Sequence, residues 1–114
     1  MPRSELVSSG YLEMWLFAMF DLPVKTKEEK RAYTRFRTLL LKEGFSKMQF
    51  SIYARFCGSE EVAETHRERL RRVLPKDGHI RLLAVTDRQF GKMEVFYGRK
   101  RGKTESKPDQ LQLF

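Results

Sequence analysis

Residues 14–21, MWLFAMFD, constrain the fold of this chain more than any other segment. Their apolar run does not alternate with polar residues, which is typical of a strand that is buried on both faces. Pro23 comes two residues after Asp21 and prevents the strand from continuing. We therefore expect residues 14–21 to form a central strand of a sheet, with Asp21 at its carboxyl end.

The next segments predict one helix and two short strands. Thr26 and Glu29 have the spacing of a capping box, which predicts a helix over about Lys27–Glu43. Two short segments, Phe45–Met48 and Ser51–Phe56, then have strand patterns, and the second alternates between apolar and polar residues. The intervening residues, Gln49 and Phe50, form either a turn or a bulge.

A second helix is predicted after Ser59, where Glu60 and Glu61 suit the positive end of the helix dipole. Its inner face is expected to carry Val62, His66, Leu70 and Val73. Ile80–Thr86 predicts a fourth strand, and Met93–Tyr97 predicts an extra one beyond it.

This order of elements predicts an α+β fold of the ferredoxin-like βαββαβ type, with an extra carboxyl-terminal strand. We expect the domain to span residues 14–98, after a loose leader over residues 1–13. Residues 99–114 are expected to form a basic tail that ends in an alternating segment, Gln110–Phe114. That segment either adds a strand to the edge of a neighbouring sheet or stays unstructured.

Charge and cysteine content narrow the class of protein. The 114 residues include 23 Lys and Arg against 15 Asp and Glu, a net charge of +8, which favours a polyanionic partner over a merely basic protein. Cys57 is the single cysteine, so no internal disulfide or Cys-rich zinc site is expected, and a lone thiol fits a reducing cytoplasm. The longest apolar run is too short to cross a bilayer, so we expect no membrane contact.

The basic residues of the first helix are the strongest candidates for contacts with phosphates. Four of them recur on one side of the helix: Lys27, Arg31, Arg35 and Lys42. The arginines at the end of the second helix are expected to be structural, since they suit the helix dipole and can pair with Glu64 and Glu68. A further cluster in the tail is either a phosphate contact or a solvated linker: Arg99, Lys100, Arg101 and Lys103.

Asp21 is the candidate catalytic residue. Mg²⁺ takes one or two carboxylates together with phosphate oxygens and water, so a carboxylate at the end of a central strand suits it. Two copies of Asp21 across a dimer axis would supply a facing pair, and the alternative is that Asp21 only caps the Leu22-Pro23 turn. His66 is expected to be a core histidine, and Cys57 to be structural. His66 and His79 do not have metal-ligand spacing.

Several motifs in the same order resemble the CRISPR-associated protein 2 family, in the version found beside type II systems. They are Met19–Pro23 (MFDLP), Arg31–Arg37 (RAYTRFR), Gln49–Arg55 (QFSIYAR), Thr86–Gly91 (TDRQFG) and the terminal QLQLF. The resemblance covers about residues 14–98 and the extreme carboxyl terminus. The family often has Tyr before the aspartate, where this chain has Phe20.

The resemblance implies a ferredoxin-like homodimer in a bacterial cytoplasm and a metal-dependent endonuclease, with Asp21 as the Mg²⁺ ligand. It also implies a role in spacer acquisition, in which the dimer binds duplex DNA and bridges two dimers of the CRISPR integrase subunit. RNA is the other nucleic acid that the family is described as cutting. Two other functions remain open from the residues alone: a single-strand RNA-binding module and a ferredoxin-like toxin ribonuclease.

Overall fold

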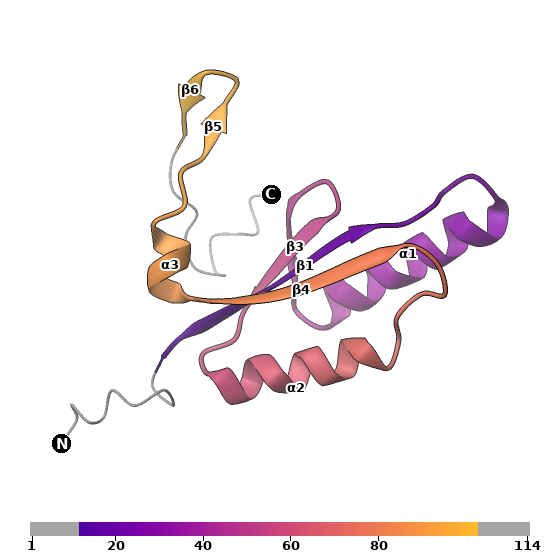
Figure 1. Ribbon diagram of the computed structural model, residues 1–114, viewed down its shortest axis with the longest axis horizontal. Helices are drawn as coiled ribbons and strands as arrows, with labels where there is room; N and C mark the ends of the chain where they lie inside the picture. The colour runs from indigo at the N-terminus through magenta and orange to yellow at the C-terminus, as the bar shows by residue number, and fades with distance from the viewer. Residues whose placement is uncertain (1–11, 103–114) are drawn as a thin grey trace.

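The computed structural model describes residues 12–102 of the chain, and its main sheet has four antiparallel strands (Figure 1). Along the sheet the order is β2 (Ser46–Gln49), β3 (Ile52–Phe56), β1 (Met14–Asp21) and β4 (His79–Thr86). Two longer helices, α1 (Lys27–Lys42) and α2 (Glu60–Arg71), connect the strands. This arrangement confirms the predicted ferredoxin-like α+β fold, with β1 in a central position.

The first helix begins where the capping box predicts. Thr26 Oγ1 accepts a hydrogen bond from the backbone N–H of Glu29 at 3.0 Å, and Glu29 accepts one in return from the N–H of Thr26 at 3.0 Å. Two otherwise unpaired donors of the first turn are thereby satisfied. These backbone hydrogen bonds lower the pKa of Glu29. The helix is therefore positioned directly after the end of β1.

One face of β1 packs against the two helices. Met14, Leu16, Ala18 and Phe20 alternate along the strand and are all buried in the main core. The core also takes side chains from both helices: Phe36, Leu40, Ala63 and Leu70. Because strand side chains alternate, Trp15, Phe17, Met19 and Asp21 point to the other face, which we call the open face.

A short helix, α3 (Asp87–Gly91), covers one end of the open face. Phe90 stacks on Trp15 with ring centroids 3.7 Å apart and planes 6° from parallel, and Trp15 Nε1 donates to Asp87 Oδ1 at 2.8 Å. Trp15 is fully buried, so β1 is covered on both faces at this end. The expectation of a strand buried on both faces is confirmed for this half of β1, whereas Phe17 and Met19 further along are only partly buried.

The carboxyl-terminal part of the described chain differs from expectation. Residues 87–91 form α3 where no helix was predicted, and the predicted strand Met93–Tyr97 is reduced to β5 (Phe96–Tyr97). β5 pairs with β6 (Lys100–Arg101) in a separate hairpin that projects away from the main sheet (Figure 1). The extra strand therefore does not join the main sheet of its own chain.

Two inner-face predictions for α2 are wrong. Val62 is 38% exposed and Val73 is 41% exposed, whereas Ala63, His66 and Leu70 are buried. The buried residues are spaced by three and four positions, so Val62 lies beside the stripe, and Val73 lies beyond the end of the helix. The prediction of a leader over residues 1–13 falls almost entirely outside the described residues, as do Lys103 and the terminal segment Gln110–Phe114.

Candidate active site and nucleic-acid interface

Asp21 ends β1 on the open face, and its side chain is exposed. Within residues 12–102 its carboxylate takes part in no hydrogen bond or ion pair, so capping of the Leu22-Pro23 turn has no support in these contacts. Phe20, the preceding aromatic residue, points the opposite way and packs against Tyr33, Phe36 and Tyr53. A hydroxyl on residue 20 would therefore lie in the core and not beside Asp21.

The register of β1 and β4 brings two basic residues to Asp21. His79 is the direct cross-strand partner of Asp21, and Arg81 is the partner of Met19. Direct partners lie on the same face with Cβ atoms about 4.5–5.5 Å apart. His79 and Arg81 thus share the end of the open face with Asp21. Sequence reasoning missed both, because strand register between distant segments leaves no local signal.

The β2–β3 turn completes a shallow hollow at the same place. The hollow has a volume of about 270 Å³, and its lining includes Asp21, Phe50, Ser51 and Arg81. Ser51 has a positive φ of 64°, and its carbonyl accepts a hydrogen bond of 3.0 Å from the backbone N–H of Phe20. The turn is therefore attached to β1 one residue before Asp21.

Gly78, in the turn before β4, packs closely against the backbone at Asp21. It has a φ of +93°, and a Cβ on this residue would lie 2.7 Å from the Asp21 carbonyl oxygen and 2.7 Å from Leu22 Cδ2. Any side chain at position 78 would displace the end of β1. The position of Asp21 thus depends on this glycine.

A metal ion fits this site only with help from outside a single chain. Within the described part of the chain no group of three or more His, Cys, Asp or Glu side chains is placed to hold a metal. Mg²⁺ needs only one or two carboxylates when phosphate oxygens and water fill its other positions. One exposed, unpaired Asp21 meets that requirement with a substrate phosphate, and two copies meet it better.

The four basic residues predicted on α1 lie where a phosphate backbone can reach them. Lys27, Arg31, Arg35 and Lys42 are exposed. Arg31 and Arg35 line a shallow depression together with Lys30 and Thr34. None of the four predicted residues makes an ion pair with another described residue. Their charge is therefore available to a partner.

The arginines of α2 are engaged within the chain, as predicted. Arg67 pairs with Glu64 at 3.3 Å, and Arg71 pairs with Glu64 at 3.4 Å and with Glu68 at 2.9 Å. In the tail cluster, Arg99 is exposed in the turn of the β5–β6 hairpin, and Lys100 and Arg101 form β6. The free positive charge of the two long helices is thus concentrated on α1.

A polar cluster around the buried His66 joins the end of α1 to α2. His66 is buried, as expected for a core histidine, and its Nδ1–H donates to Glu43 Oε1 at 2.6 Å. Arg69 donates to the same oxygen at 3.3 Å, and Arg55 Nε donates to the Glu43 carbonyl at 2.7 Å. Burial opposes ionisation of Glu43, but the hydrogen bonds from His66 and Arg69 outweigh it and lower its pKa.

Cys57 and Tyr53 lack the character of reactive groups. Cys57 is buried, its Sγ donates to the Arg55 carbonyl at 3.5 Å, and burial raises the pKa of its thiol. Burial also raises the pKa of Tyr53, against the hydrogen bond from Arg37. A structural role for Cys57 was the prediction, and these contacts agree with it.

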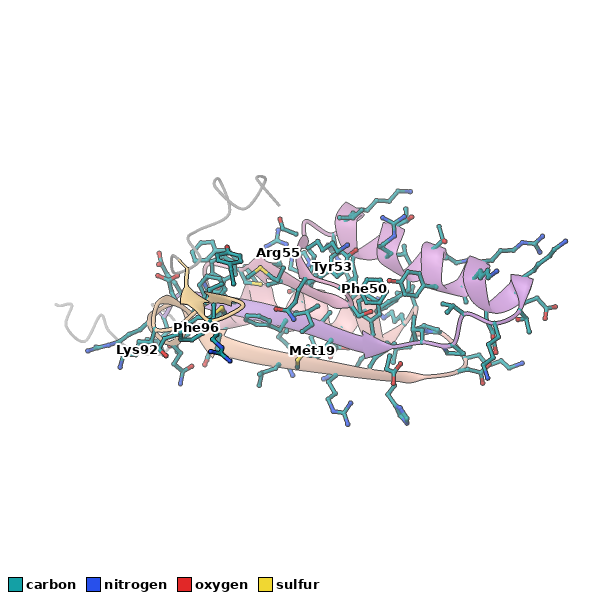
Figure 2. All side chains as sticks on the ribbon, turned by 90° about the horizontal axis from the view of Figure 1, so that it is seen from above. Met19, Phe50, Tyr53, Arg55, Lys92 and Phe96 are labelled. Atoms are coloured by element: carbon teal, nitrogen blue, oxygen red, sulfur yellow. The ribbon has the colours of Figure 1, made fainter. Side chains whose placement is uncertain are left out.

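An apolar groove runs along the rest of the open face. Its volume is about 800 Å³, and its lining extends from β1 and β4 to α3 and β5. Its most exposed hydrophobic members are Leu83 at 49%, Phe96 at 54% and Tyr97 at 65%. Figure 2 shows Phe96 near Lys92 toward one end of the molecule and Phe50 nearer its middle. The groove adjoins the hollow at Asp21 on the open face, because Met19 and Ile52 line both.

Among the described residues, no helix has the length and apolar character needed to cross a membrane.

Comparison with known proteins places the chain in one family. The profile of the family described as CRISPR associated protein Cas2 matches residues 14–93. A relative from Parvibaculum lavamentivorans is 50% identical over 101 residues, which are 89% of this chain and 100% of the relative. A relative from Flavobacterium psychrophilum is 48% identical over 91% of this chain and 90% of its own length, and one from Paracidovorax avenae is 42% identical over 93% and 98%.

All three relatives bear the name CRISPR-associated endoribonuclease Cas2. The family match confirms the resemblance drawn from the sequence motifs, and the shared name confirms the expected assignment to a family of nucleases. The names give no support to a single-strand RNA-binding module or a toxin ribonuclease.

Proposed function

The chain belongs to the CRISPR-associated Cas2 family, and on that premise we propose that it is a Mg²⁺-dependent endonuclease of spacer acquisition, with Asp21 as its catalytic and metal-binding residue. The observation that carries this proposal is an exposed carboxylate without a partner among the described residues, at the end of the central strand. RNA is the proposed substrate for cleavage, in line with the names of the relatives.

Asp21 and its neighbours Arg81 and His79 would have different roles in phosphodiester cleavage. Mg²⁺, when bound, supplies positive charge that stabilises the charge developing on the phosphoryl oxygens. Asp21 would hold the ion, and Arg81 would bind a phosphate oxygen beside it. His79, the cross-strand partner of Asp21, is an imidazole, the side chain most often used for proton transfer.

A substitution of Asp21 tests the catalytic proposal. Asp21→Asn keeps the shape of the side chain but removes its charge, and we expect cleavage of end-labelled RNA in Mg²⁺ to fall about a hundredfold or more. Asp77→Asn is the matched control, since Asp77 is another exposed carboxylate, in the turn before β4. Equal activity of the Asp21→Asn protein and the wild type would refute the role of Asp21.

We propose that the open face is the interface of a homodimer, which would bring two copies of Asp21 toward a common axis. The apolar groove with exposed Leu83, Phe96 and Tyr97 supports this, since contiguous apolar patches mark interaction surfaces. Leu83→Glu should give a monomer in analytical ultracentrifugation. Leu41→Glu should leave the dimer intact, because Leu41 is similarly exposed, at 47%, but lies on α1.

We further propose that α1 binds the backbone of duplex DNA while the dimer bridges two integrase dimers, in a bacterial cytoplasm. The exposed lysine and arginine side chains of α1, which have no ion pair with described residues, support the DNA contact. Each phosphate that is no longer neutralised reduces the slope of log K against log salt by about 0.9. Arg31→Gln with Arg35→Gln should therefore lower the slope by about 1.8, twice that single-phosphate value, whereas Arg69→Gln with Arg71→Gln should not.

The proposed bridging requires the integrase subunit. Gel filtration of the protein with that subunit and a short duplex should give one complex that contains all three components. Separate elution of the protein from the integrase, at concentrations where the duplex is bound, would contradict the bridging role.

A further inference from the structure

We propose that the hollow at the β2–β3 turn is a subsite for a single nucleotide of an unpaired strand, in which Phe50 stacks on the base and Arg81 binds the phosphate. The subsite would hold the nucleotide next to the scissile bond at Asp21. This inference rests on the proposed phosphodiesterase function, and it adds how that site would bind its substrate.

Phe50 is placed as a stacking platform. It is 75% exposed, the largest exposed fraction among the large hydrophobic residues of the described chain. Its ring lies 6.4 Å from that of Tyr33 with planes 25° apart, and Lys47 Nζ lies 5.7 Å from its centroid. These neighbours orient the ring while most of it stays open to solvent. An exposed ring held in this way suits a base, because every nucleobase has a π-face.

The backbone that presents Phe50 is irregular. The register of β2 against β3 shifts between Lys47 and Gln49, and Ser51 has the left-handed φ of 64°. A non-glycine residue in this region costs free energy and persists only where its surroundings hold it. Here the hydrogen bond between Phe20 N–H and the Ser51 carbonyl holds the turn against the end of β1.

Three kinds of side chain line the same hollow, and each matches one part of a nucleotide. Asp21 supplies a carboxylate for a metal ion at the phosphodiester, Arg81 supplies a planar cation for a phosphate, and Phe50 supplies an aromatic surface for a base. The hollow is small and open, so it suits one unpaired nucleotide and not a duplex, whose bases are already stacked on one another. Figure 2 shows Phe50 near the part of the sheet that carries Met19.

A second copy of the chain is the other partner that an exposed phenyl ring would suit. The chemistry of the hollow favours the nucleotide, because Asp21 and Arg81 line it together with the ring, whereas the adjoining groove has a mostly apolar lining. The test below distinguishes nucleotide binding from a contact between two copies of the chain.

The test measures binding in the absence of cleavage. An eight-nucleotide RNA with one 2-aminopurine is titrated with the full chain in EDTA, and the quenching of its fluorescence reports stacking. Phe50→Ala should weaken binding roughly 5- to 150-fold, the range for loss of one stacked base. Phe50→Trp should bind within about threefold of the wild type, and Phe50→Leu, which keeps apolar bulk without a ring, should behave like Phe50→Ala.

The salt dependence of RNA binding distinguishes the phosphate contact of Arg81 from the base stacking of Phe50. Arg81→Gln should lower the slope of log K against log salt by about 0.7, the value for one phosphate of a single strand, whereas Phe50→Ala should leave the slope unchanged. Leu41→Ala is the control for loss of an exposed apolar side chain elsewhere, and it should change neither quenching nor slope.

Three outcomes would overturn the subsite. They are unchanged binding by Phe50→Ala, equal binding by the Leu and Trp variants, and conversion of the protein to a monomer by Phe50→Ala. The last outcome would assign the ring to a contact between copies. The binding titration involves neither a metal ion nor cleavage. Its result can therefore be interpreted even if cleavage does not depend on Asp21.

Discussion

Glu43 is the residue whose replacement best tests how the two long helices are held together. Its carboxylate accepts hydrogen bonds from His66 at 2.6 Å and from Arg69 at 3.3 Å, and the side chains of Glu43 and His66 are only 24% and 9% exposed. Glu43→Gln keeps an acceptor for His66 but replaces a charged hydrogen bond with a neutral one. The net value of such a bond falls from about 1.5–3 to about 0.5–1.5 kcal/mol.

We therefore expect Glu43→Gln to lower the free energy of unfolding by about 1–2 kcal/mol at pH 7. Arg69 adds little to this value, because its side chain is 55% exposed and solvent screens the pair. In a domain of this size the loss corresponds to a fall in Tm of about 5–15 °C. Glu43→Ala should cost about 2–4 kcal/mol, since it also leaves the buried His66 ring without its partner.

The lowered pKa of Glu43 also predicts how the stability difference between wild type and Glu43→Gln changes with pH. The pKa of Glu43 lies below its ordinary value of 4.5 in the folded protein. Its contribution to stability is therefore complete above its ordinary pKa of 4.5 and is lost as the pH falls through the lowered folded value. The difference between wild type and Glu43→Gln should be largest at neutral pH and should disappear in acid.

Thermal and urea unfolding of the full chain, followed by circular dichroism, measures these differences. Protein concentration must be held constant, because the proposed dimer would make Tm depend on it. Glu64→Gln is the control, since Glu64 is 52% exposed in its pairs with Arg67 and Arg71 and should change stability by less than about 0.5 kcal/mol. A Glu43→Gln protein as stable as the wild type at pH 7, or a difference that grows in acid, would refute the reasoning.

Four other variants or reagents test separate features. Phe90→Ala should cost about 3–5 kcal/mol in urea unfolding and reduce the near-ultraviolet signal of Trp15, and a loss below about 1 kcal/mol would contradict the packing of α3. Cys57 should react with a thiol reagent far more slowly in the folded chain than in urea, because it is buried and its pKa is raised. Ser51→Gly should raise stability by up to about 1 kcal/mol, since glycine adopts the positive φ without strain, and a loss would argue against it. Thr26→Ala should lower stability by about 1 kcal/mol through loss of the helix cap, as measured by thermal unfolding.

The parts of the fold that were predictable depend on local signals. The boundaries of β1 follow from its apolar run and Pro23, and the start of α1 follows from Thr26 and Glu29, which contact each other directly. The short helix α3 was missed because five residues do not show a helical period. Its own capping box, Thr86 with Gln89, was the one available signal.

The site was only partly predictable for a similar reason. Asp21 stands out because it interrupts an apolar segment, but its neighbours come from elsewhere in the chain. His79 and Arg81 reach it through the register of β4, and Phe50 reaches it through the bulge and the positive φ at the β2–β3 turn. Register and bulges are set by packing of the whole sheet, so no single segment contains them.

The alternation of side chains along β1 also determines how mutations in this strand would be classified in a genetic screen. Substitutions at Leu16, Ala18 or Phe20 open the main core and would reduce the amount of folded protein in the cell. Substitutions at Met19 or Asp21 leave that core intact, so their effects would appear in the proposed dimer formation or cleavage at normal protein abundance. Two residues that are neighbours in sequence would therefore fall into different phenotypic classes.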